Sequence, residues 1–443
     1  MGRIELASAV NSTSTSIPTQ GTQTTSDTEE RAGITNALAF TNGELAYDHG
    51  WLAWSQVLAS FLLFFNTWGI VTTYGVFQTY YQEEMLDYES PSTISWIGSI
   101  QAFLLLFLGG VTGPLFDGGY NTAMLIFGSI MLPFGLMMTS ISTKLWQIML
   151  AQAICVGLAC GSLFVSSVAI LPQYFKKKRA LVNGLTASGS AVGGVVYPIV
   201  FRQMLLKINF AWATRILGFM SFATCLASLS LMRVRFKPQE KRALIQLSAF
   251  KEPQFALLCL AEFLGFCGLY NMVVFIQPYA IKNKIMSKDT AFYLVAILNG
   301  SSFFGRVFPN YLAGFVGPVN VLIPMTFLCG VLPLCWVGIY TEPGLIVLVI
   351  LYGISSGAFV SVPSITMMSI TPDLRDLGTR LGMSFICCAF GALIGTPVGG
   401  AIMDRTDSYL GLELLAGMCF FASTAVLVAM RLVIVGPKVL VRV

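Results

Sequence analysis

Twelve long apolar segments dominate the sequence, and each is long enough to cross a lipid bilayer. About 20 consecutive apolar residues make a transmembrane helix, and inside lipid only helices or closed barrels satisfy the backbone hydrogen bonds. Only 11% of the 443 residues are charged, far fewer than in a soluble domain. The sequence therefore predicts an all-α polytopic membrane protein with transmembrane helices near 54–80, 94–116, 121–141, 145–171, 180–206, 210–232, 254–281, 291–314, 319–340, 344–370, 379–402 and 410–432.

The stretch from Tyr174 to Gly194 indicates how these helices are oriented. It begins with four consecutive cations, Lys176, Lys177, Lys178 and Arg179, and continues into an apolar run rich in glycine, alanine and serine. Clusters of Lys and Arg stay on the cytoplasmic side of a membrane, and most of the other cations fall in predicted loops on this same side. We therefore expect both termini in the cytoplasm, and we assign the four cations to topology and membrane-surface contact.

A pattern of glycine and proline occurs twice along the chain. Gly189 and Gly193 precede Pro198, and Gly391 and Gly395 precede Pro397 in the same way, at an offset of 202 residues (391 − 189). The turns GPLFDGGYN (113–121) and YLAGFVGPVN (311–320) also correspond. The repeat predicts two six-helix halves in parallel orientation, which is the architecture of the major facilitator superfamily, with the substrate path between the halves.

The predicted domains follow from this repeat and from composition. Residues 2–46 are rich in Ser, Thr, Gln and Asn, a composition typical of disorder. We expect a disordered cytoplasmic tail (1–47), an N-terminal half (48–232), a basic cytoplasmic loop (233–253), a C-terminal half (254–433) and a short cytoplasmic tail (434–443).

Four glycines and one aspartate are candidates for gating or structural roles. Small residues let membrane helices approach closely, so we expect close helix packing at Gly189, Gly193, Gly391 and Gly395 that slides during transport. Asp117 ends the second segment. We expect it to cap or pair across the short turn and hold a gate, rather than to touch a substrate.

No pattern typical of an enzyme or a metal site occurs in the sequence. There is no glycine-rich phosphate loop, no CxxC spacing and only one histidine, His49. The ten cysteines lie mostly inside apolar segments, where cysteine behaves as a small hydrophobic residue. We therefore expect no enzyme activity, cofactor, metal or nucleic acid partner. The expected partners are the lipid bilayer, a small organic solute and, as an open alternative, protons, while the oligomeric state stays open.

Two ionisable residues inside the apolar segments are the main functional candidates, since such residues are rare in membranes and usually functional. Arg306 in the eighth segment is a candidate anion anchor, because arginine can grip a carboxylate with two hydrogen bonds. The alternative is a structural cation satisfied by helix-end carbonyls or by a gate partner. Glu262 in the seventh segment is a candidate proton-coupling acid. It could equally pair with a cation such as Arg306 or face a wet crevice.

Polar side chains in three segments are further candidates for substrate binding. Asn66, Tyr74 and Gln78 share one face of the first segment. Tyr270 and Asn271 lie in the seventh segment, and Asn299 lies in the eighth. As alternatives, the tyrosines near the outer end of the first segment could belong to an interfacial belt, and Asn271 could bond a neighbouring helix.

Several motifs resemble the monocarboxylate transporter family of the major facilitator superfamily, in its fungal branch. They are DHGWLAW (48–54), YFKKKRALVNGLTASGSAVGG (174–194), SPSTISWIGSIQAFLLLFLGGVTGPLFDGGY (90–120) and NGSSFFGRVFPNYLAGFVGPVN (299–320). The similarity spans residues 48 to about 435. The resemblance implies secondary transport of monocarboxylates by alternating access, often coupled to protons. It also implies, for the fungal branch, carriers of riboflavin and exporters of secondary metabolites.

The sequence departs from this family at positions tied to coupling. Ser302 stands where animal members have an aspartate one turn before the arginine, and no Lys or Arg occurs between 51 and 81. Gly314 and Gly118 replace a loop aspartate and an arginine. Arg306 carries over, whereas the family's coupling residues do not.

These observations predict a secondary transporter of the monocarboxylate porter type. It would move a small organic, carboxylate-bearing solute by alternating access at the plasma membrane of a fungus, with a vacuolar or other internal membrane as the alternative location. Two other functions remain open, an exporter of a fungal secondary metabolite and a non-transporting membrane sensor with the same fold.

Overall fold

The computed structural model describes residues 50–176, 178–235, 246–372 and 376–436. Within these ranges, twelve helical segments are long and apolar enough to cross a membrane, and no β-strand occurs. Each predicted segment overlaps one of them, so the all-α fold with twelve transmembrane helices is confirmed. The predicted N-terminal tail, Lys177 and parts of the predicted basic loop and C-terminal tail lie outside the described residues.

The first six spans begin with α2 (Trp51–Tyr80), which continues as the π-helix η2 (Tyr81–Met85). α3 (Pro91–Leu115) continues as η3 (Phe116–Tyr120). The remaining four spans are α4 (Asn121–Ile141), the composite of α5 (Leu145–Ile148), η4 (Met149–Val156), α6 (Gly157–Ala169) and η5 (Leu171–Gln173), then α7 (Arg179–Lys207) and α8 (Phe210–Leu231).

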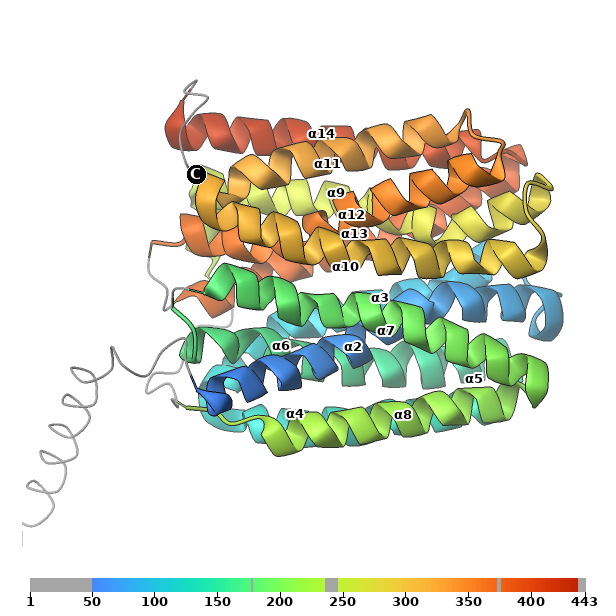
Figure 1. Cartoon of the computed structure of the whole chain (residues 1–443), viewed down its shortest axis with the longest axis horizontal. Helices are drawn as coiled ribbons and strands as arrows, with labels where there is room; N and C mark the ends of the chain where they lie inside the picture. The colour runs from blue at the N-terminus through green and yellow to red at the C-terminus, as the bar shows by residue number, and fades with distance from the viewer. Residues whose placement is uncertain (1–49, 177, 236–245, 373–375, 437–443) are drawn as a thin grey trace, which may run out of the picture. The chain divides into compact units, whose positions relative to one another are not determined.

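The last six spans follow the short helix η6 (Leu247–Lys251). They are α9 (Pro253–Lys282), α10 (Lys288–Val316), α11 (Pro318–Trp336), α12 (Glu342–Ile370), α13 (Leu377–Thr406) and α14 (Leu410–Val435). The beginning of α2 and the end of α14 lie at the same face, on the left of Figure 1. We call it the terminal face, and the opposite one the distal face.

Side-chain caps fix where three of the helices begin at the distal face. The side chain of Ser90 accepts the Thr93 backbone N–H at 3.1 Å before α3, and Asn209 accepts the Trp212 N–H at 2.9 Å before α8. Ser287 does the same for α10. Such caps satisfy backbone donors that have no partner inside the helix. They therefore set short turns that keep consecutive spans antiparallel.

The helices form two groups, which Figure 1 shows below and above one another. The group α2–α8 packs mainly within itself, and so does the group α9–α14. Between the groups, α3 packs on α13 and α7 packs on α10. These four helices therefore line the boundary at which a substrate path between halves would run.

The first group contains a close helix contact at two of the predicted glycines. Gly189 and Gly193 of α7 lie against the backbone carbonyls of Phe61 and Phe65 in α2. A Cβ atom at either glycine would collide with those oxygens, so only glycine allows this approach.

The second group repeats this contact between α13 and α9. Gly391 lies against the carbonyl of Phe263, and Gly395 lies against that of Cys267. The contacted residues are again 202 positions apart between the groups (263 − 61 and 267 − 65), like the glycines themselves. The repeat found in the sequence therefore reappears as a repeated contact. That these contacts slide during transport stays a prediction.

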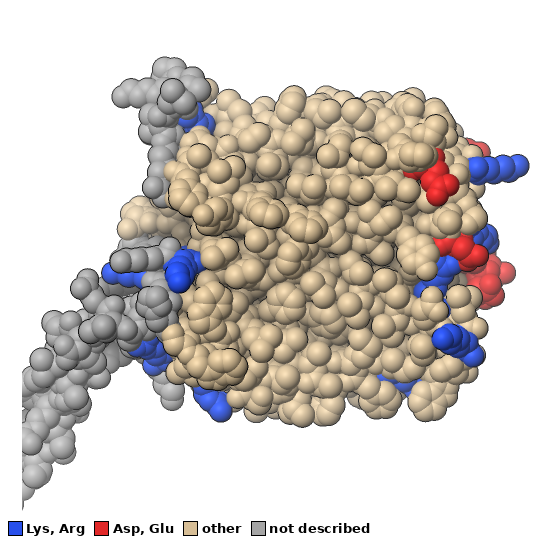
Figure 2. Space-filling view, in the orientation of Figure 1, with Lys and Arg blue, Asp and Glu red and all other residues tan. Residues whose placement is uncertain are grey.

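The charged side chains gather at the two faces and leave an uncharged band between them, as Figure 2 shows. Large apolar side chains are exposed along this band, among them Phe304, Phe308 and Phe315 of α10. An exposed apolar band of this kind is stable only against lipid, because water would disfavour it.

Candidate substrate path

Three of the cavities at the boundary between the two groups of helices make up the candidate path, and a fourth, of about 780 Å³, lies beside Arg179 near the terminal face. The central cavity has a volume of about 40 Å³ and is lined by side chains that include Glu262 and Arg306. The terminal-side cavity, of about 160 Å³, lies between α3, α6, α7, α12 and α13. The distal cavity, of about 30 Å³, lies between α2, α3, α9 and α13. The central and distal cavities have room for a few waters, so the path is collapsed around its centre.

Arg306 is buried in α10 and projects into the central cavity. Its side chain is only 6% exposed, and one of its N–H groups donates to Ser302 Oγ one turn earlier. The guanidinium Nε has no hydrogen-bond partner, and no carboxylate lies within ion-pair distance among the described residues. A buried cation without a counter-charge is unfavourable. The arrangement therefore suits an acceptor group brought by a ligand.

Glu262 of α9 lines the same cavity and is 5% exposed. Its carboxylate accepts hydrogen bonds from Ser384 Oγ and, at 3.3 Å, from Cys388 Sγ, both in α13. No ion pair joins it to Arg306 or to another described cation. An ion pair between Glu262 and Arg306, one of the alternatives from the sequence, is therefore not the arrangement found here.

Aromatic side chains form much of the wall of the central cavity. Phe164 contacts Phe64, Trp68 and Phe385, with ring centroids 5.7, 5.8 and 5.1 Å away. Phe64, Trp68 and Phe164 belong to the first group of helices and Phe385 to the second. Faces and edges of aromatic rings bind flat apolar molecules well. The cavity thus combines an aromatic wall with one cation and one carboxyl group.

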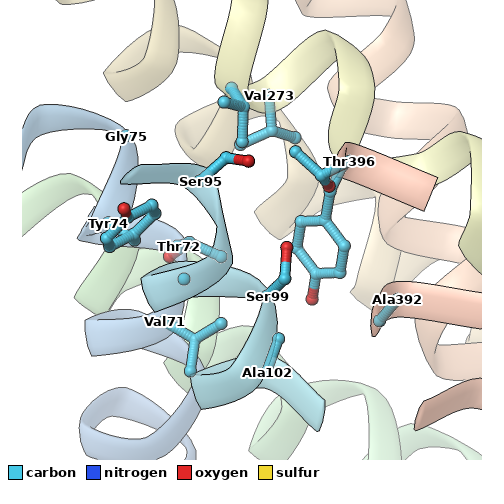
Figure 3. A pocket seen from close by; sticks show the side chains of 13 residues that line it. Val71, Thr72, Tyr74, Gly75, Ser95, Ser99, Ala102, Val273, Ala392 and Thr396 are labelled. Carbon is cyan, nitrogen blue, oxygen red and sulfur yellow. The ribbon is translucent and has the colours of Figure 1, made fainter. Parts of the chain in front are cut away.

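The central cavity continues toward the terminal face but not toward the distal face. It shares Val168, Asn183 and Phe385 with the terminal-side cavity. On the other side, the rings of Phe266 and Tyr270, one turn apart on α9, separate the central cavity from the distal cavity. Figure 3 shows the distal cavity, where hydroxyl-bearing side chains of α2, α3 and α13 form part of the wall. In this conformation the central cavity therefore adjoins the terminal-side cavity.

Two ion pairs close the boundary at the distal face. Arg202 at the end of α7 binds the Asp289 carboxylate, donates to the Asp289 backbone carbonyl at 2.9 Å and lies 4.4 Å from the Phe292 ring centroid. Lys288 pairs with Glu83 at 3.1 Å. Both pairs join the first group to the beginning of α10, so they hold the two groups together on this side.

A different ion pair lies at the terminal face, within the second group. Arg380 of α13 is 3% exposed and binds both oxygens of Glu252, the residue before α9, at 2.7 and 2.5 Å. These hydrogen bonds from Arg380 lower the pKa of Glu252 below its ordinary value. The pair ties the start of α9 to the start of α13 within the second group.

Three of the predicted substrate-binding residues line a cavity. Arg306 lines the central cavity, and Tyr74 and Tyr270 line the distal cavity. The Tyr74 hydroxyl donates to the backbone carbonyl of Ile94, which fixes α2 to α3. The structure thus places these three, together with Glu262, along one path.

The other four predicted substrate-binding residues lie in helix interfaces and line none of the three cavities. Asn66 accepts hydrogen bonds from Tyr197 at 2.6 Å and Thr224 at 3.0 Å. Gln78 is buried, and the amides of Asn271 and Asn299 each donate to the carbonyl one turn earlier in their own helix. In this conformation they take part in helix packing, which the sequence offered as an alternative for Asn271, and a role in substrate binding stays a prediction for all four.

The predicted basic cluster and the predicted gating residue Asp117 both lie near the terminal face. Lys176 and Lys178 are exposed there, and Arg179 donates from Nε to the Phe175 carbonyl at 2.7 Å. The backbone of Asp117 lies in η3, whereas its side chain is outside the described part of the structure. Its gating role therefore stays a prediction.

The sequence alone did not point to Asn183, Ser384 or Cys388. Asn183 lines both the central and the terminal-side cavity and donates to the Ser361 carbonyl at 3.3 Å, across the boundary between the groups. A polar amide within the signature stretch 174–194 was the available signal for it. Ser384 and Cys388 contact Glu262 from more than 120 positions away, and no sequence signal links them.

The fold and this path define a class of protein, a membrane transporter in which two groups of helices enclose a binding cavity. A sequence model of the Major Facilitator Superfamily matches residues 56–337. The chain belongs to this superfamily, and it is a transporter rather than an enzyme.

The chain is similar to several fungal transporters in sequence and to solved transporter structures in fold. The chain is 42% identical over 371 residues to the MFS-type transporter dbaD of Emericella nidulans, covering 83% of this chain and 84% of that protein. It is 35% identical over 368 residues to the aspyridones efflux protein apdF of the same species, covering 83% and 75%. A crystal structure of the nucleoside transporter NupG has a TM-score of 0.64 at 16% identity and covers 86% of this chain and 99% of that one. This last likeness shows the fold alone.

Proposed function

We propose that this transporter exports an aromatic organic metabolite, which binds in the central cavity with a polar group held by Arg306. The observation that carries the proposal is a buried guanidinium that pairs with no carboxylate in the described part of the chain, in a cavity walled by Trp68, Phe164 and Phe385. A carbonyl or carboxylate of the ligand would satisfy that guanidinium. The relative named as an efflux protein supports export as the direction.

The terminal face is the cytoplasmic face in this proposal, and the membrane is the plasma membrane of a fungus. The exposed Lys176 and Lys178 at the terminal face support this orientation. The two groups of helices act as the N-terminal half (48–232) and the C-terminal half (254–433). With the distal face closed by Arg202 and its partners, the conformation described here would be the one that receives substrate from the cytoplasm.

Substrate binding requires the two halves to separate slightly. The central cavity of about 40 Å³ is far smaller than the 300 Å³ or more of common ligand sites. The hydrogen bond between Asn183 and the Ser361 carbonyl and the contact between Gly110 and Gly382 span the boundary at this level. We infer that the substrate enters through the terminal-side cavity and replaces these contacts, and that the halves then close behind it.

Uptake of a small monocarboxylate is the second candidate function. The resemblance to the monocarboxylate transporter family favours it, and so does the position of Arg306 in α10, which suits a carboxylate as well as a carbonyl. The two candidates differ in the direction of net flux and in the size of the solute.

The experiment is a flux assay in sealed vesicles of both orientations with the purified full chain. Two probes are used, 2-acetyl-6-hydroxynaphthalene as a neutral aromatic ketone and lactate as a small carboxylate. We expect movement of the aromatic probe from the terminal face to the distal face, and a loss of at least about tenfold in Arg306→Ala, since a hydrogen bond to a charged group contributes about 1.5–3 kcal/mol. Arg306→Lys separates loss of charge from loss of geometry.

Arg215→Ala is the matched control, because Arg215 also lies in a membrane helix but away from the cavities. It bonds Ser140 at 3.1 Å and stacks on Trp212 with its guanidinium 5.1 Å from the ring centroid. We expect this variant to transport like the wild type. Wild-type flux in Arg306→Ala, at equal protein in the membrane, would refute the proposed site, and net uptake of lactate alone would favour the second candidate.

A further inference from the structure

The carboxyl group of Glu262 lies in the central cavity but is not the ion-pair partner of Arg306. It is buried, it is bound by two neutral donors, and it faces the same cavity as the arginine without pairing with it. Two opposite charges share a cavity and are kept apart. Each is therefore free to interact with something that enters.

We propose that Glu262 is the proton-exchange group of this transporter and that the substrate competes with the proton for it. The substrate class is then a neutral aromatic molecule with an acceptor, such as a ketone, for Arg306 and an O–H or N–H donor for the Glu262 carboxylate. The inference rests on the proposed export function and deepens it.

The other titratable groups around Glu262 are few and poorly suited to this role. On α9 itself they are Cys259 and Tyr270, and from α13 they are Cys387 and Cys388. α10 contributes Arg306 and α12 contributes Tyr352, whose hydroxyl donates to the Leu269 carbonyl. The side chains that approach from α2 and α14 are Phe64, Trp68 and Ser423, which do not titrate. Among the described residues, Glu262 is thus the one carboxyl group that lines the central cavity.

The chemistry of the ligand decides the sign of the coupling between ligand and proton. An anion on Arg306 removes the positive charge that favours the Glu262 carboxylate, so the anion and a proton on Glu262 favour each other and move in the same direction. A neutral ligand that donates a hydrogen bond to the carboxylate requires it without its proton. Such a ligand and the proton exclude each other.

Only the second case lets an inward proton gradient drive export. The substrate binds from the cytoplasm, and the proton of Glu262 leaves to the cytoplasm as the ligand O–H takes its place. After the halves reorient, a proton from the outside binds the carboxylate and the substrate departs. One proton is exchanged for one neutral substrate, and no further reactant is needed.

The geometry of the cavity agrees with this competition. Ser384 and Cys388 approach one of the two carboxylate oxygens, Oε2. The other oxygen, Oε1, is left for a ligand donor or a proton. The aromatic wall of Phe164 and Phe385 stands beside it and suits a flat ring carrying both polar groups.

The test measures binding to the purified full chain with three related probes. 2-Acetyl-6-hydroxynaphthalene has an acceptor and a donor, 2-acetyl-6-methoxynaphthalene lacks the donor, and 2-naphthoate is an anion. For the hydroxy ketone we expect tighter binding at about pH 7 than at about pH 5, by up to roughly tenfold per pH unit, with release of a proton into weak buffer. The methoxy ketone should bind weakly without releasing a proton, and 2-naphthoate should show the opposite pH dependence.

Glu262→Gln is expected to abolish the pH dependence for the hydroxy ketone and for 2-naphthoate while binding persists. Glu413→Gln is the matched control, because Glu413 is a buried membrane carboxyl group of α14 that is 3% exposed and lines none of the three cavities. Melting temperatures of both variants show whether they fold. Should Glu262→Gln fail to fold, Ser384→Ala serves instead, since it removes a donor to the carboxylate and should shift the pH midpoint.

The outcomes separate this inference from the proposed function. If the pH dependence persists in Glu262→Gln while Arg306→Ala abolishes flux, the proton-exchange role is wrong and the export site stands. If the hydroxy ketone does not bind, or if it binds with proton uptake, the proposed substrate class is wrong. If Arg306→Ala leaves flux unchanged, the proposed function itself fails.

Discussion

We call the contacts of Arg202 with Asp289 and Phe292 at the start of α10 the distal clasp. We expect the distal clasp to determine the fraction of molecules that are open at the distal face. Arg202→Ala removes three contacts that bridge the two groups of helices, the ion pair with Asp289, the hydrogen bond to its backbone carbonyl and the contact with the Phe292 ring. The closed form should lose stability relative to the form open at the distal face.

The size of the effect follows from the exposure of each partner. The Asp289 side chain is 87% exposed, and an ion pair with so exposed a partner contributes about 0–1 kcal/mol. The ring contact with Phe292 adds about 0.5–1 kcal/mol. A hydrogen bond from a charged donor adds about 1.5 kcal/mol. Together they give about 2–3.5 kcal/mol, which corresponds to a shift of roughly 30- to 300-fold in the equilibrium.

The assay is the rate at which a membrane-impermeant maleimide labels a cysteine in the distal cavity. Ser99 lines that cavity and is 5% exposed, so Ser99→Cys reports opening. The exposed Cys335 is replaced by serine beforehand. When labelling is limited by the open population, the labelling rate should rise by the same roughly 30- to 300-fold in Arg202→Ala.

Two further variants make the prediction sharper. Asp289→Asn loses only the exposed ion pair, so its labelling should rise less than about fivefold. Lys282→Ala removes an ion pair with Asp407 at the same face but within the second group of helices, and its labelling should not change. A labelling rate in Arg202→Ala within threefold of the wild type, or an equal rise in Lys282→Ala, would refute the distal clasp.

Two predictions concern stability rather than transport. Glu252→Gln leaves the buried Arg380 without its counter-charge and should destabilise the chain in detergent by about 2–4 kcal/mol at neutral pH. This loss is somewhat smaller than for a fully buried ion pair, because Glu252 is partly exposed. Arg380 lowers the pKa of Glu252 from the ordinary 4.5. The stabilisation by the ion pair is therefore complete above pH 4.5 and is lost as the pH falls through the lowered pKa of the folded chain. Thermal unfolding between pH 6 and pH 3 should therefore weaken the wild type more than Glu252→Gln, and equal slopes would contradict the pairing. Gly193→Leu should prevent the close contact of α7 with α2 and abolish the monodisperse folded protein in size-exclusion chromatography, and a wild-type elution profile would contradict that contact.

The helices were predictable from the sequence because hydropathy over about 20 residues reports the bilayer directly. The repeated glycines were predictable for a related reason, since a close backbone approach admits no other residue. What hydropathy does not report is a change of hydrogen-bond pattern inside a span. The fourth span contains the π-helix η4 (Met149–Val156) between α5 and α6, which stays equally apolar throughout.

The site was predictable where a residue type is unfavourable in its surroundings. Arg306 and Glu262 were candidates because buried charges need partners, but the partners of Glu262 come from α13, 122 and 126 positions away. The sequence predicted that Asn66 and Tyr74 share one face of their helix, but it did not predict which neighbour packs against that face. Asn66 meets Tyr197 of α7, so it packs between helices, whereas Tyr74 reaches the distal cavity.

The terminal-side cavity offers a way to arrest the transporter. Its volume of about 160 Å³ lies between α3, α6 and α7 of one group and α12 and α13 of the other, and apolar side chains and glycines such as Gly109 and Gly382 form much of its wall. A compact apolar compound wedged there would contact both groups in this conformation and lose those contacts in any other. It would therefore act as a conformation-selective inhibitor that competes with substrate entering from the terminal face, and its potency would depend on how rarely the protein leaves this state.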